Sequence, residues 1–278
     1  MEGRQNVRMD TFRLLFIGDV VGSEAVTAVQ RLVPELRGEL GLNAAILNGE
    51  NSAPSGRGIT VESGEALLTA VDFLTLGDHT FDQEDIGGFL DQERRVVRPA
   101  NLREDLPGRG WGIFESSGVC VGVANVQGRV FMEAPRSPFE AAEQTVAELQ
   151  NSGAEVILVD VHAEATSEKQ AMGWHLAGRV AAVMGTHTHV PTADLHVLPC
   201  GTAYASDVGM TGGREGIIGF NRDGFMRIFV GGEGPSIAPA GGSGALDAVL
   251  IEIERGSGQA LSVERVFRRW DESGELQR

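Results

Sequence analysis

The chain has 278 residues, of which 42% are hydrophobic and 22% are charged, and its formal net charge is −16. These proportions are typical of a globular protein, and the acidic charge argues against duplex DNA or an anionic membrane as a partner, because such binding depends on cationic contacts to phosphates. The apolar run Leu14–Ile17 is cut off by Asp19 and is too short for a signal peptide or a membrane span, so we predict a cytoplasmic protein.

From the N-terminus onward, short apolar runs alternate with helical patterns, which predicts an α/β fold with much parallel sheet. Strands are expected at 13–19, in AAILNGEN (44–51, with its exit loop), in DFLTLGDH (72–79), and near 96–100, 119–126, 156–161 and 180–184. Helices are expected at 23–40, 61–70, 139–150 and 167–177. Beyond residue 193 we expect short, more antiparallel strands within 193–207, 225–232, 245–254 and 261–270. A single domain over 1–278, with its core at about 13–268, is predicted.

Polar side chains that can bind a metal or titrate follow five of the predicted strands. They are Asp19, Glu50, Asn51, Asp78, His79, His162, His187 and His189. Taken alone, each has an ordinary explanation, since Asp19 could cap the next helix and Asn51 could close a turn. Loops at the carboxyl ends of strands converge on one crevice in open α/β sheets, so we expect these side chains to meet.

The stretch GTHTHVP holds two of the six histidines of the chain, His187 and His189. On an extended backbone the side chains alternate with a period of two, so both rings are expected on the same side. Alone, this pattern fits a half-exposed pair on a turn as well as it fits a metal site. Its position after a predicted strand favours the metal site.

The seven candidate ligands other than His79 comprise three carboxylates, one amide and three imidazoles. A mixed oxygen and nitrogen set suits Fe or Mn best, with Zn as a further option, and is too rich in nitrogen for Ca. It is also too large for one ion with about four to six ligands, which predicts two ions that share a carboxylate. Neither an H-E-x-x-H motif nor a phosphate-binding P-loop occurs.

Longer motifs are more specific than H-x-H. They are GDVVG, NGENSAPSGRGIT, LGDHTFD, VRPAN, VDVHAEATSEKQAMGWHLAGRVAAVMGTHTHVPTAD and GTAYASDVGMTG. Together, over about 14–229, they resemble the YmdB-like branch of the calcineurin-like metallophosphoesterases. The resemblance implies a four-layer αββα sandwich, a dinuclear metal site, and phosphodiesterase activity on 2′,3′-cyclic and 3′,5′-cyclic nucleotides.

The resemblance also implies roles for single residues. Asp19, Glu50, Asn51 and His189 would hold one ion, and Glu50, Asp78, His162 and His187 the other, with Glu50 as the bridge. Metal-activated hydroxide would attack phosphorus, and His79 would donate a proton to the leaving group, with Asp82 as its candidate partner. His175 and His196 match no position of the family and are assigned to structure or surface.

One position departs from the family pattern, which usually reads G-N-H where residues 77–79 of this chain read G-D-H. Asp78 adds a third carboxylate to Asp19 and Glu50. We expect it to tighten cation binding and to leave less Lewis acidity for activating water. Metal preference and rate are therefore the properties least safely transferred from the family.

Two features allow two interpretations. Arg57 in SGRG could contact a substrate phosphate or simply be solvated, and the glycine-rich stretch 208–216 could be a lid or an edge of the pocket. Cys120 and Cys200 are expected to be buried free thiols. The same metal ligands would also serve a phosphomonoesterase or nucleotidase acting on a small phosphorylated substrate. A further alternative, based on Asp78, is a regulatory nucleotide- or metal-binding protein with vestigial activity. The oligomeric state, a homo-oligomer included, is left open.

Overall fold

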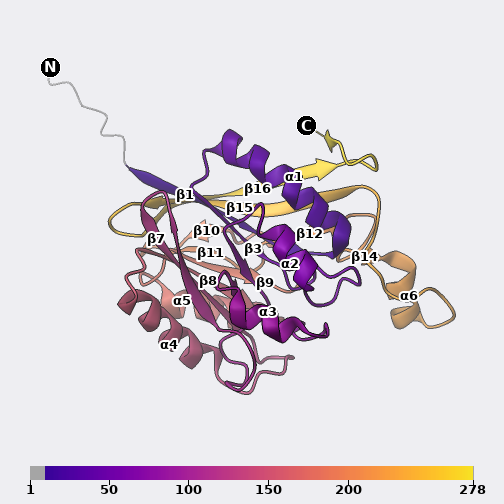
Figure 1. Ribbon diagram of the computed structural model, residues 1–278, viewed down its shortest axis with the longest axis horizontal. Helices are drawn as coiled ribbons and strands as arrows, with labels where there is room; N and C mark the ends of the chain where they lie inside the picture. Colours follow the sequence, from indigo (N-terminus) through magenta and orange to yellow (C-terminus); the bar gives the residue numbers. More distant parts are fainter. Residues whose placement is uncertain (1–9, 278) are drawn as a thin grey trace.

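The computed structural model describes residues 10–277, so the first nine residues and Arg278, which the predicted domain included, lie outside it. Two β-sheets lie face to face and helices cover the outer face of each, as Figure 1 shows. This arrangement is the predicted four-layer αββα sandwich. Within the described residues, no helix is both long enough and apolar enough to cross a membrane.

The larger sheet has the strand order β17-β16-β15-β1-β3-β4-β5, and β12 pairs with both β15 and β2. Its strands are β1 (Thr11–Ile17), β2 (Asp19–Val20), β3 (Ala44–Asn48), β4 (Phe73–Thr75), β5 (Val96–Val97), β12 (Met210–Gly213), β15 (Gly244–Glu254), β16 (Ala260–Trp270) and β17 (Leu276–Gln277). The run β1-β3-β4-β5 is parallel, whereas β15, β16 and β17 are antiparallel to their neighbours. The expected change to antiparallel pairing late in the chain is confirmed.

The smaller sheet has the order β10-β11-β9-β8-β7-β6. Its strands are β6 (Trp111–Ser116), β7 (Val119–Gln127), β8 (Val156–His162), β9 (Ala182–Thr186), β10 (His196–Val197) and β11 (Ala203–Ala205). Strands β7, β8, β9 and β11 are parallel, so in both sheets several parallel strands end at a common edge. A separate hairpin joins β13 (Gly216–Ile217) to β14 (Phe220–Asn221).

Strand β1 is buried on both faces, which explains its almost continuous apolar sequence. Phe12, Leu14 and Phe16 point into the core between the two sheets. Leu15 and Ile17 point the other way, toward the helices that cover the larger sheet. One strand therefore joins two of the three apolar layers.

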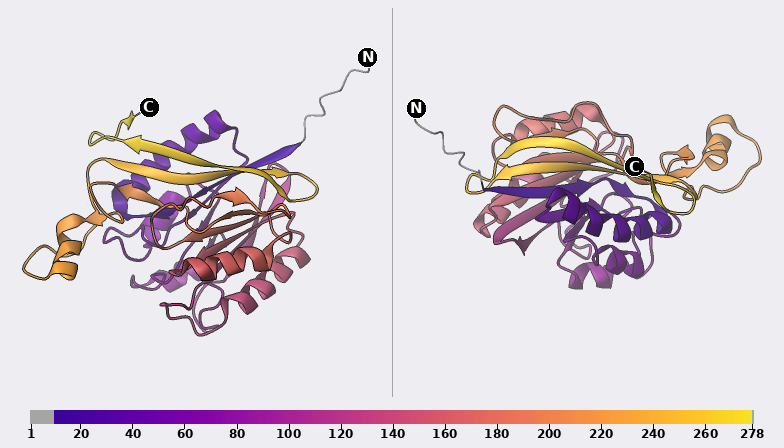
Figure 2. Two further views of the ribbon diagram at one scale, coloured as in Figure 1. Left: turned by 180° about the vertical axis from the view of Figure 1, so that it is seen from behind. Right: turned by 90° about the horizontal axis from the view of Figure 1, so that it is seen from above.

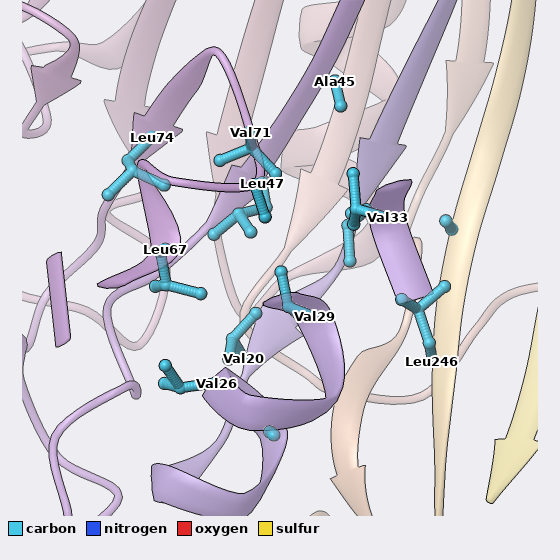
Figure 3. Close-up of a cluster of buried hydrophobic side chains, with 14 of the residues drawn as sticks. Val20, Val26, Val29, Val33, Ala45, Leu47, Leu67, Val71, Leu74 and Leu246 are labelled. Atoms are coloured by element: carbon cyan, nitrogen blue, oxygen red, sulfur yellow. The ribbon is translucent and has the colours of Figure 1, made fainter. Parts of the chain in front are cut away.

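Helices α1 (Gly22–Leu40), α2 (Val61–Leu67) and α3 (Ile86–Gln92) cover the larger sheet, and α4 (Pro138–Asn151) and α5 (Thr166–Leu176) cover the smaller one. Figure 3 shows Val26, Val29 and Val33 of α1 packed toward the side chains of Leu47 and Leu74 on the sheet. Their spacing of three and four residues places them on one helix face. The helix ends at Gly41, whose φ of 61° is the left-handed conformation that glycine adopts easily.

Some predictions about local structure were wrong. Residues 225–232 were expected to form a strand, but most of them lie in helix α6 (Arg222–Val230), and β6 and α3 were not predicted. The stretch 208–216 is no lid, because its central part is the buried strand β12. Cys120 and Cys200 are partly exposed rather than buried, because Cys120 opposes Glu115 near the end of the β6–β7 hairpin and Cys200 lies in a turn.

Candidate metal centre

The candidate ligands come from both sheets and meet at the carboxyl ends of their strands. From the larger sheet, Asp19 follows β1, Glu50 follows β3 and Asp78 follows β4. From the smaller sheet, His162 ends β8 and His187 follows β9. The larger sheet thus supplies the carboxylates and the smaller sheet supplies the imidazoles. The expected convergence of strand ends is confirmed, and it occurs across the sandwich.

Four of these side chains form one tight group. The ligand atoms of Glu50, Asp78, His162 and His187 all lie within 4.8 Å of one another. Nε2 of His162 is 3.0 Å from Oε1 of Glu50, 3.0 Å from Oδ1 of Asp78 and 3.1 Å from Nδ1 of His187. Two carboxylates and two imidazoles that converge in this way offer a cation four donor atoms from the ends of four separate strands.

A second group lies beside the first, and Oδ1 of its Asp19 is 3.8 Å from Nδ1 of His162. Nε2 of His189 is 3.2 Å from Oδ1 of Asn51 and 3.9 Å from Oδ1 of Asp19. That Asp19 oxygen is buried and, within residues 10–277, accepts no hydrogen bond. Burial, together with nearby carboxylates, raises the pKa of Asp19 to about 8, although His162 opposes the shift. A buried carboxylate oxygen without a donor is an acceptor that a cation would satisfy.

The charges in the first group are strongly coupled. Burial disfavours the ionised form of each group, but Glu50 and Asp78 outweigh burial and raise the pKa of His162. Hydrogen bonds from His162 and His187 likewise overcome burial and hold the pKa of Asp78 well below its usual range. Without a metal, a proton on Nε2 of His162 therefore occupies the space between the carboxylates. A metal ion and this proton would compete for one position.

Hydrogen bonds behind the group fix the orientation of the His162 ring. The Thr186 hydroxyl donates to Oδ1 of Asp160 at 2.7 Å, so at 2.9 Å it accepts from Nδ1 of His162. The other oxygen of Asp160 accepts from Thr75 at 2.5 Å and from Asn48 at 3.0 Å. Because Nδ1 is the donor to Thr186, Nε2 is the nitrogen that faces Glu50 and Asp78.

The two histidines of GTHTHVP do not point to the same side. Strand β9 ends at Thr186, and the backbone then takes left-handed φ values of 93° at His187 and 64° at His189. The expectation of an extended H-x-H segment was wrong, because the turn begins within the motif. As a result the His187 ring lies 4.8 Å from the His162 ring in the first group, whereas His189 lies beside Asn51 in the second.

Gly77 precedes Asp78 at a point where no side chain fits. A Cβ atom added there would come within 2.3 Å of both Oε2 of Glu50 and Cδ2 of His162. The glycine allows the loop after β4 to pass directly against the two side chains, and so brings Asp78 within reach of His162.

His79 lies at the edge of the four-residue group. Its Nδ1 atom is 3.0 Å from Oδ2 of Asp82, as expected, and 3.3 Å from Nη2 of Arg57. Its backbone N–H donates to Oε2 of Glu50 at 3.0 Å. The His79 ring lines a cavity of about 420 Å³ that opens over the candidate ligands. The other residues lining it are Glu50, Asn51, Arg57, Glu164, His187, Thr188, His189, Ile218, Phe220, Phe225 and Ile237.

Comparison with known proteins agrees with this geometry. The family described as YmdB-like protein matches residues 15–266. The chain belongs to the YmdB-like family. A 2′,3′-cyclic-nucleotide 2′-phosphodiesterase of Bacillus subtilis is 42% identical over 256 residues, which cover 92% of this chain and 96% of that protein.

Two solved structures share the fold of this chain over almost its whole length. A hypothetical protein from Thermus thermophilus has a TM-score of 0.85 at 38% identity, with 94% of this chain and 100% of that chain covered. A novel phosphatase from Mycoplasma pneumoniae has a TM-score of 0.85 at 29% identity, with 95% of each chain covered. The predicted fold class and the resemblance to this family are thereby confirmed.

Sequence reasoning missed part of the support of this YmdB-like site. Lys169, the single lysine of the chain, is 2% exposed and pairs with Asp207 at 2.9 Å. Asp207 in turn accepts hydrogen bonds from the backbone N–H of Thr188 at 3.0 Å and from its hydroxyl at 2.7 Å. This buried ion pair holds the turn between the two histidines. Its only sequence signal was a lone lysine within a helix.

Glu164 was also missed, although it follows His162 by two residues, and its Oε2 atom lies 3.2 Å from Nε2 of His187. The two histidines assigned to structure or surface lie outside both groups. His175 pairs with Glu143 at 2.9 Å, and Nδ1 of the exposed His196 lies 2.6 Å from the carbonyl oxygen of Asp194.

Proposed function

We propose that this YmdB-like protein is a metal-dependent phosphodiesterase that hydrolyses cyclic nucleotides, 2′,3′-cyclic monophosphates first and 3′,5′-cyclic monophosphates second. The observation that carries the proposal is the meeting of two adjacent donor groups at a cavity large enough for a nucleotide, whose lining includes Glu50, Asn51, His187 and His189. The Bacillus subtilis relative is named as a 2′,3′-cyclic-nucleotide 2′-phosphodiesterase, which is the reaction proposed for this chain.

We propose two ions per chain, with Fe or Mn preferred and Zn accepted. One would be held by Asp19, Glu50, Asn51 and His189, and the other by Glu50, Asp78, His162 and His187. The donor-free Asp19 oxygen supports the first site, and the convergence of four donor atoms supports the second. When bound, such a pair polarises phosphoryl oxygens and makes water a stronger acid.

The remaining steps belong to side chains of the chain itself. Asp82 accepts from Nδ1 of His79 and so orients the ring, which lines the cavity and can donate a proton from Nε2 to the departing ribose oxygen. Arg57, beside His79, offers guanidinium donors to a phosphate oxygen. Asp78 brings an additional anion to the second site, which favours tight metal binding over rapid turnover.

The proposal is tested by stripping the protein of metal and reconstituting it separately with Mn, Fe and Zn. We expect two equivalents of bound metal and faster hydrolysis of 2′,3′-cyclic AMP than of a phosphate monoester such as p-nitrophenyl phosphate. Faster monoester hydrolysis would instead assign a phosphomonoesterase or nucleotidase. Two bound equivalents without turnover of either substrate would assign a regulatory metal-binding protein.

A matched control uses a histidine from outside the site. His175→Ala should retain both metal equivalents and full turnover, because His175 contacts Glu143 on the outer face of the smaller sheet. The cytoplasmic location and the lack of duplex DNA binding stay predictions from composition. Sedimentation of the reconstituted protein would test for a homo-oligomer.

A further inference from the structure

The cavity has a polar floor, which includes Glu50, Asn51, His187 and His189, and an apolar wall. The floor and the wall come from different parts of the chain. Its wall residues are Ile218, Phe220, Phe225 and Ile237. All four lie in one segment, residues 216–239, which leaves the larger sheet after β12 and returns before β15. This segment contains the β13–β14 hairpin and helix α6, and Figure 2 shows it projecting beyond the edge of the sandwich. We call it the excursion.

The excursion contacts His189, one of the candidate metal ligands. Its Ile218 carbonyl oxygen lies 2.8 Å from Nδ1 of His189. The Phe220 ring stacks on the His189 ring at a centroid distance of 6.4 Å, with 14° between the planes. Phe220 is only 6% exposed and supports the Phe225 ring, whose centroid is 5.8 Å away. The apolar wall is therefore fixed relative to the candidate metal ligands.

The excursion also touches the loop that carries Arg57. Gly56 has a φ of 78°, and a Cβ atom added to it would lie 2.5 Å from Cε1 of Phe220. Arg57 and His79 line the same cavity as the wall. A ligand in this cavity therefore meets cationic or proton-donating groups and metal-ligating groups on one side, and flat aromatic and branched aliphatic groups on the other.

We infer that the excursion forms the nucleobase subsite, with the partly exposed Phe225 as the side chain on which the base stacks. This inference rests on the proposed function. A phosphodiester bound at Arg57 and His79 places its organic substituent against the remaining wall, and a nucleobase is a flat, uncharged group suited to Phe225. Phe220, being buried, acts as a positioning residue that supports Phe225.

The apolar wall also determines how strongly the site distinguishes one nucleobase from another. The four wall residues have apolar side chains that cannot form hydrogen bonds to base edges. Stacking accepts any base, because every base has a π face. The enzyme should therefore accept adenine, guanine, cytosine and uracil, with purines favoured over pyrimidines by their larger stacking area.

The test compares 2′,3′-cyclic AMP with an analogue that carries a methoxy group in place of the base, methyl ribofuranoside 2,3-cyclic phosphate. For Phe225→Ala we expect kcat/KM on cyclic AMP to fall about 5- to 100-fold, mainly through KM, as for the loss of a stacking aromatic side chain. Turnover of the base-free analogue should fall less than about twofold. Phe225→Trp should restore cyclic AMP turnover, whereas Phe225→Leu should restore it only in part.

Ile228→Ala is the matched control on the same helix, because Ile228 is 59% exposed and does not line the cavity. It should change neither substrate. Equal losses on both substrates, or no loss on cyclic AMP, would overturn the inference. If the wild type hydrolyses neither compound, the proposed function has failed. The subsite is then tested by calorimetry, which measures the binding of adenosine 3′-monophosphate and of its base-free counterpart. The inference holds only if Phe225→Ala weakens binding of the nucleotide and leaves binding of the base-free compound unchanged.

Discussion

The floor and the wall of the cavity are built in opposite ways. The floor is made of strand ends from both sheets. Glu50, which lines the cavity, and the adjacent Asp19 and His162, which do not, are at most 1% exposed. Its hydrogen bonds join distant parts of the chain, such as Asn48 to Asp160. The wall comes from one local excursion, whose helix α6 leaves Phe229 74% exposed. The framework therefore fixes the reacting groups, whereas an appended segment can vary and so select the substrate.

Asp19→Asn should give the largest combined effect, because it removes a proposed metal ligand and so lowers both metal content and turnover. With the carboxylate lost, we expect one metal equivalent instead of two and a fall in turnover on the order of 10³-fold, the scale of losing a buried electrostatic contact. Metal analysis and cyclic-nucleotide hydrolysis measure the two effects. Two retained equivalents would show that the first ion does not depend on Asp19.

In the metal-free protein, Asp19→Asn should instead increase the free energy of unfolding. Because burial raises the pKa of Asp19 to about 8, the folded state binds this proton more tightly than the unfolded state. The stability of metal-free wild type that depends on Asp19 is therefore lost as pH rises from about 4 to about 8. In EDTA at pH 8, Asp19→Asn should be more stable by on the order of 1–3 kcal/mol in urea unfolding. Lower stability of the variant at pH 8 would contradict this.

His79→Ala tests whether His79 donates a proton to the leaving group without taking part in metal binding. Nδ1 of its ring contacts Asp82 and Arg57, and Nε2 lies 3.6 Å from Oδ2 of Asp78. Because the ring is not one of the proposed ligands, both metals should remain bound. Turnover of 2′,3′-cyclic AMP, whose leaving oxygen needs a proton, should fall about 10²- to 10⁴-fold. A diester with a p-nitrophenolate leaving group should lose much less. Loss of metal, or full turnover of the cyclic nucleotide, would remove His79 from this role.

Thr186→Val tests the hydrogen bonds behind the floor. The change keeps the shape of the side chain but removes the hydroxyl between His162 and Asp160. We expect metal affinity to fall about 10- to 100-fold in chelator competition, the usual effect of removing a ligand's outer partner. Thr145→Val is the control, since this buried hydroxyl bonds only within α4. Equal affinities in the two variants would refute an orienting role.

The same contrast explains what could be predicted from the sequence. The strands of the floor are buried and flanked by polar residues, so runs such as 156–161, followed by His162, identify both the strand and the site. The rule that parallel strands end at one edge then brings Glu50 and Asp78 together in the larger sheet, and the packing of the two sheets face to face adds His162 from the smaller one. Hydrophobic pattern and topology act together there, and they agree with the structure.

The wall could not be predicted in the same way. The stretch from Phe225 to Val230 is almost continuously apolar, so it has neither a period of two nor a clear helical period. Its helix depends on contacts made elsewhere, because the Asn221 side chain donates to the Ser236 carbonyl at 3.0 Å and accepts from the backbone N–H of Ala238 at 3.3 Å. The left-handed turn at His187 likewise depends on a distant pair, Lys169 with Asp207.

Gly56→Ala gives the smallest expected effect and tests the joint between floor and wall. A Cβ atom there collides with Phe220 and must shift the ring, whereas the floor loses no ligand. We expect KM for cyclic AMP to rise about threefold to tenfold, which is at most about 1.4 kcal/mol, with both metals retained. Gly153→Ala is the control, because Gly153 has a similar φ of 85° but nothing within 4 Å of the added atom. Both variants should lose about 1–2 kcal/mol of stability through backbone strain. Only Gly56→Ala should change KM, and an unchanged KM would mean that the wall tolerates movement of Phe220 and does not depend on its contact with the Arg57 loop.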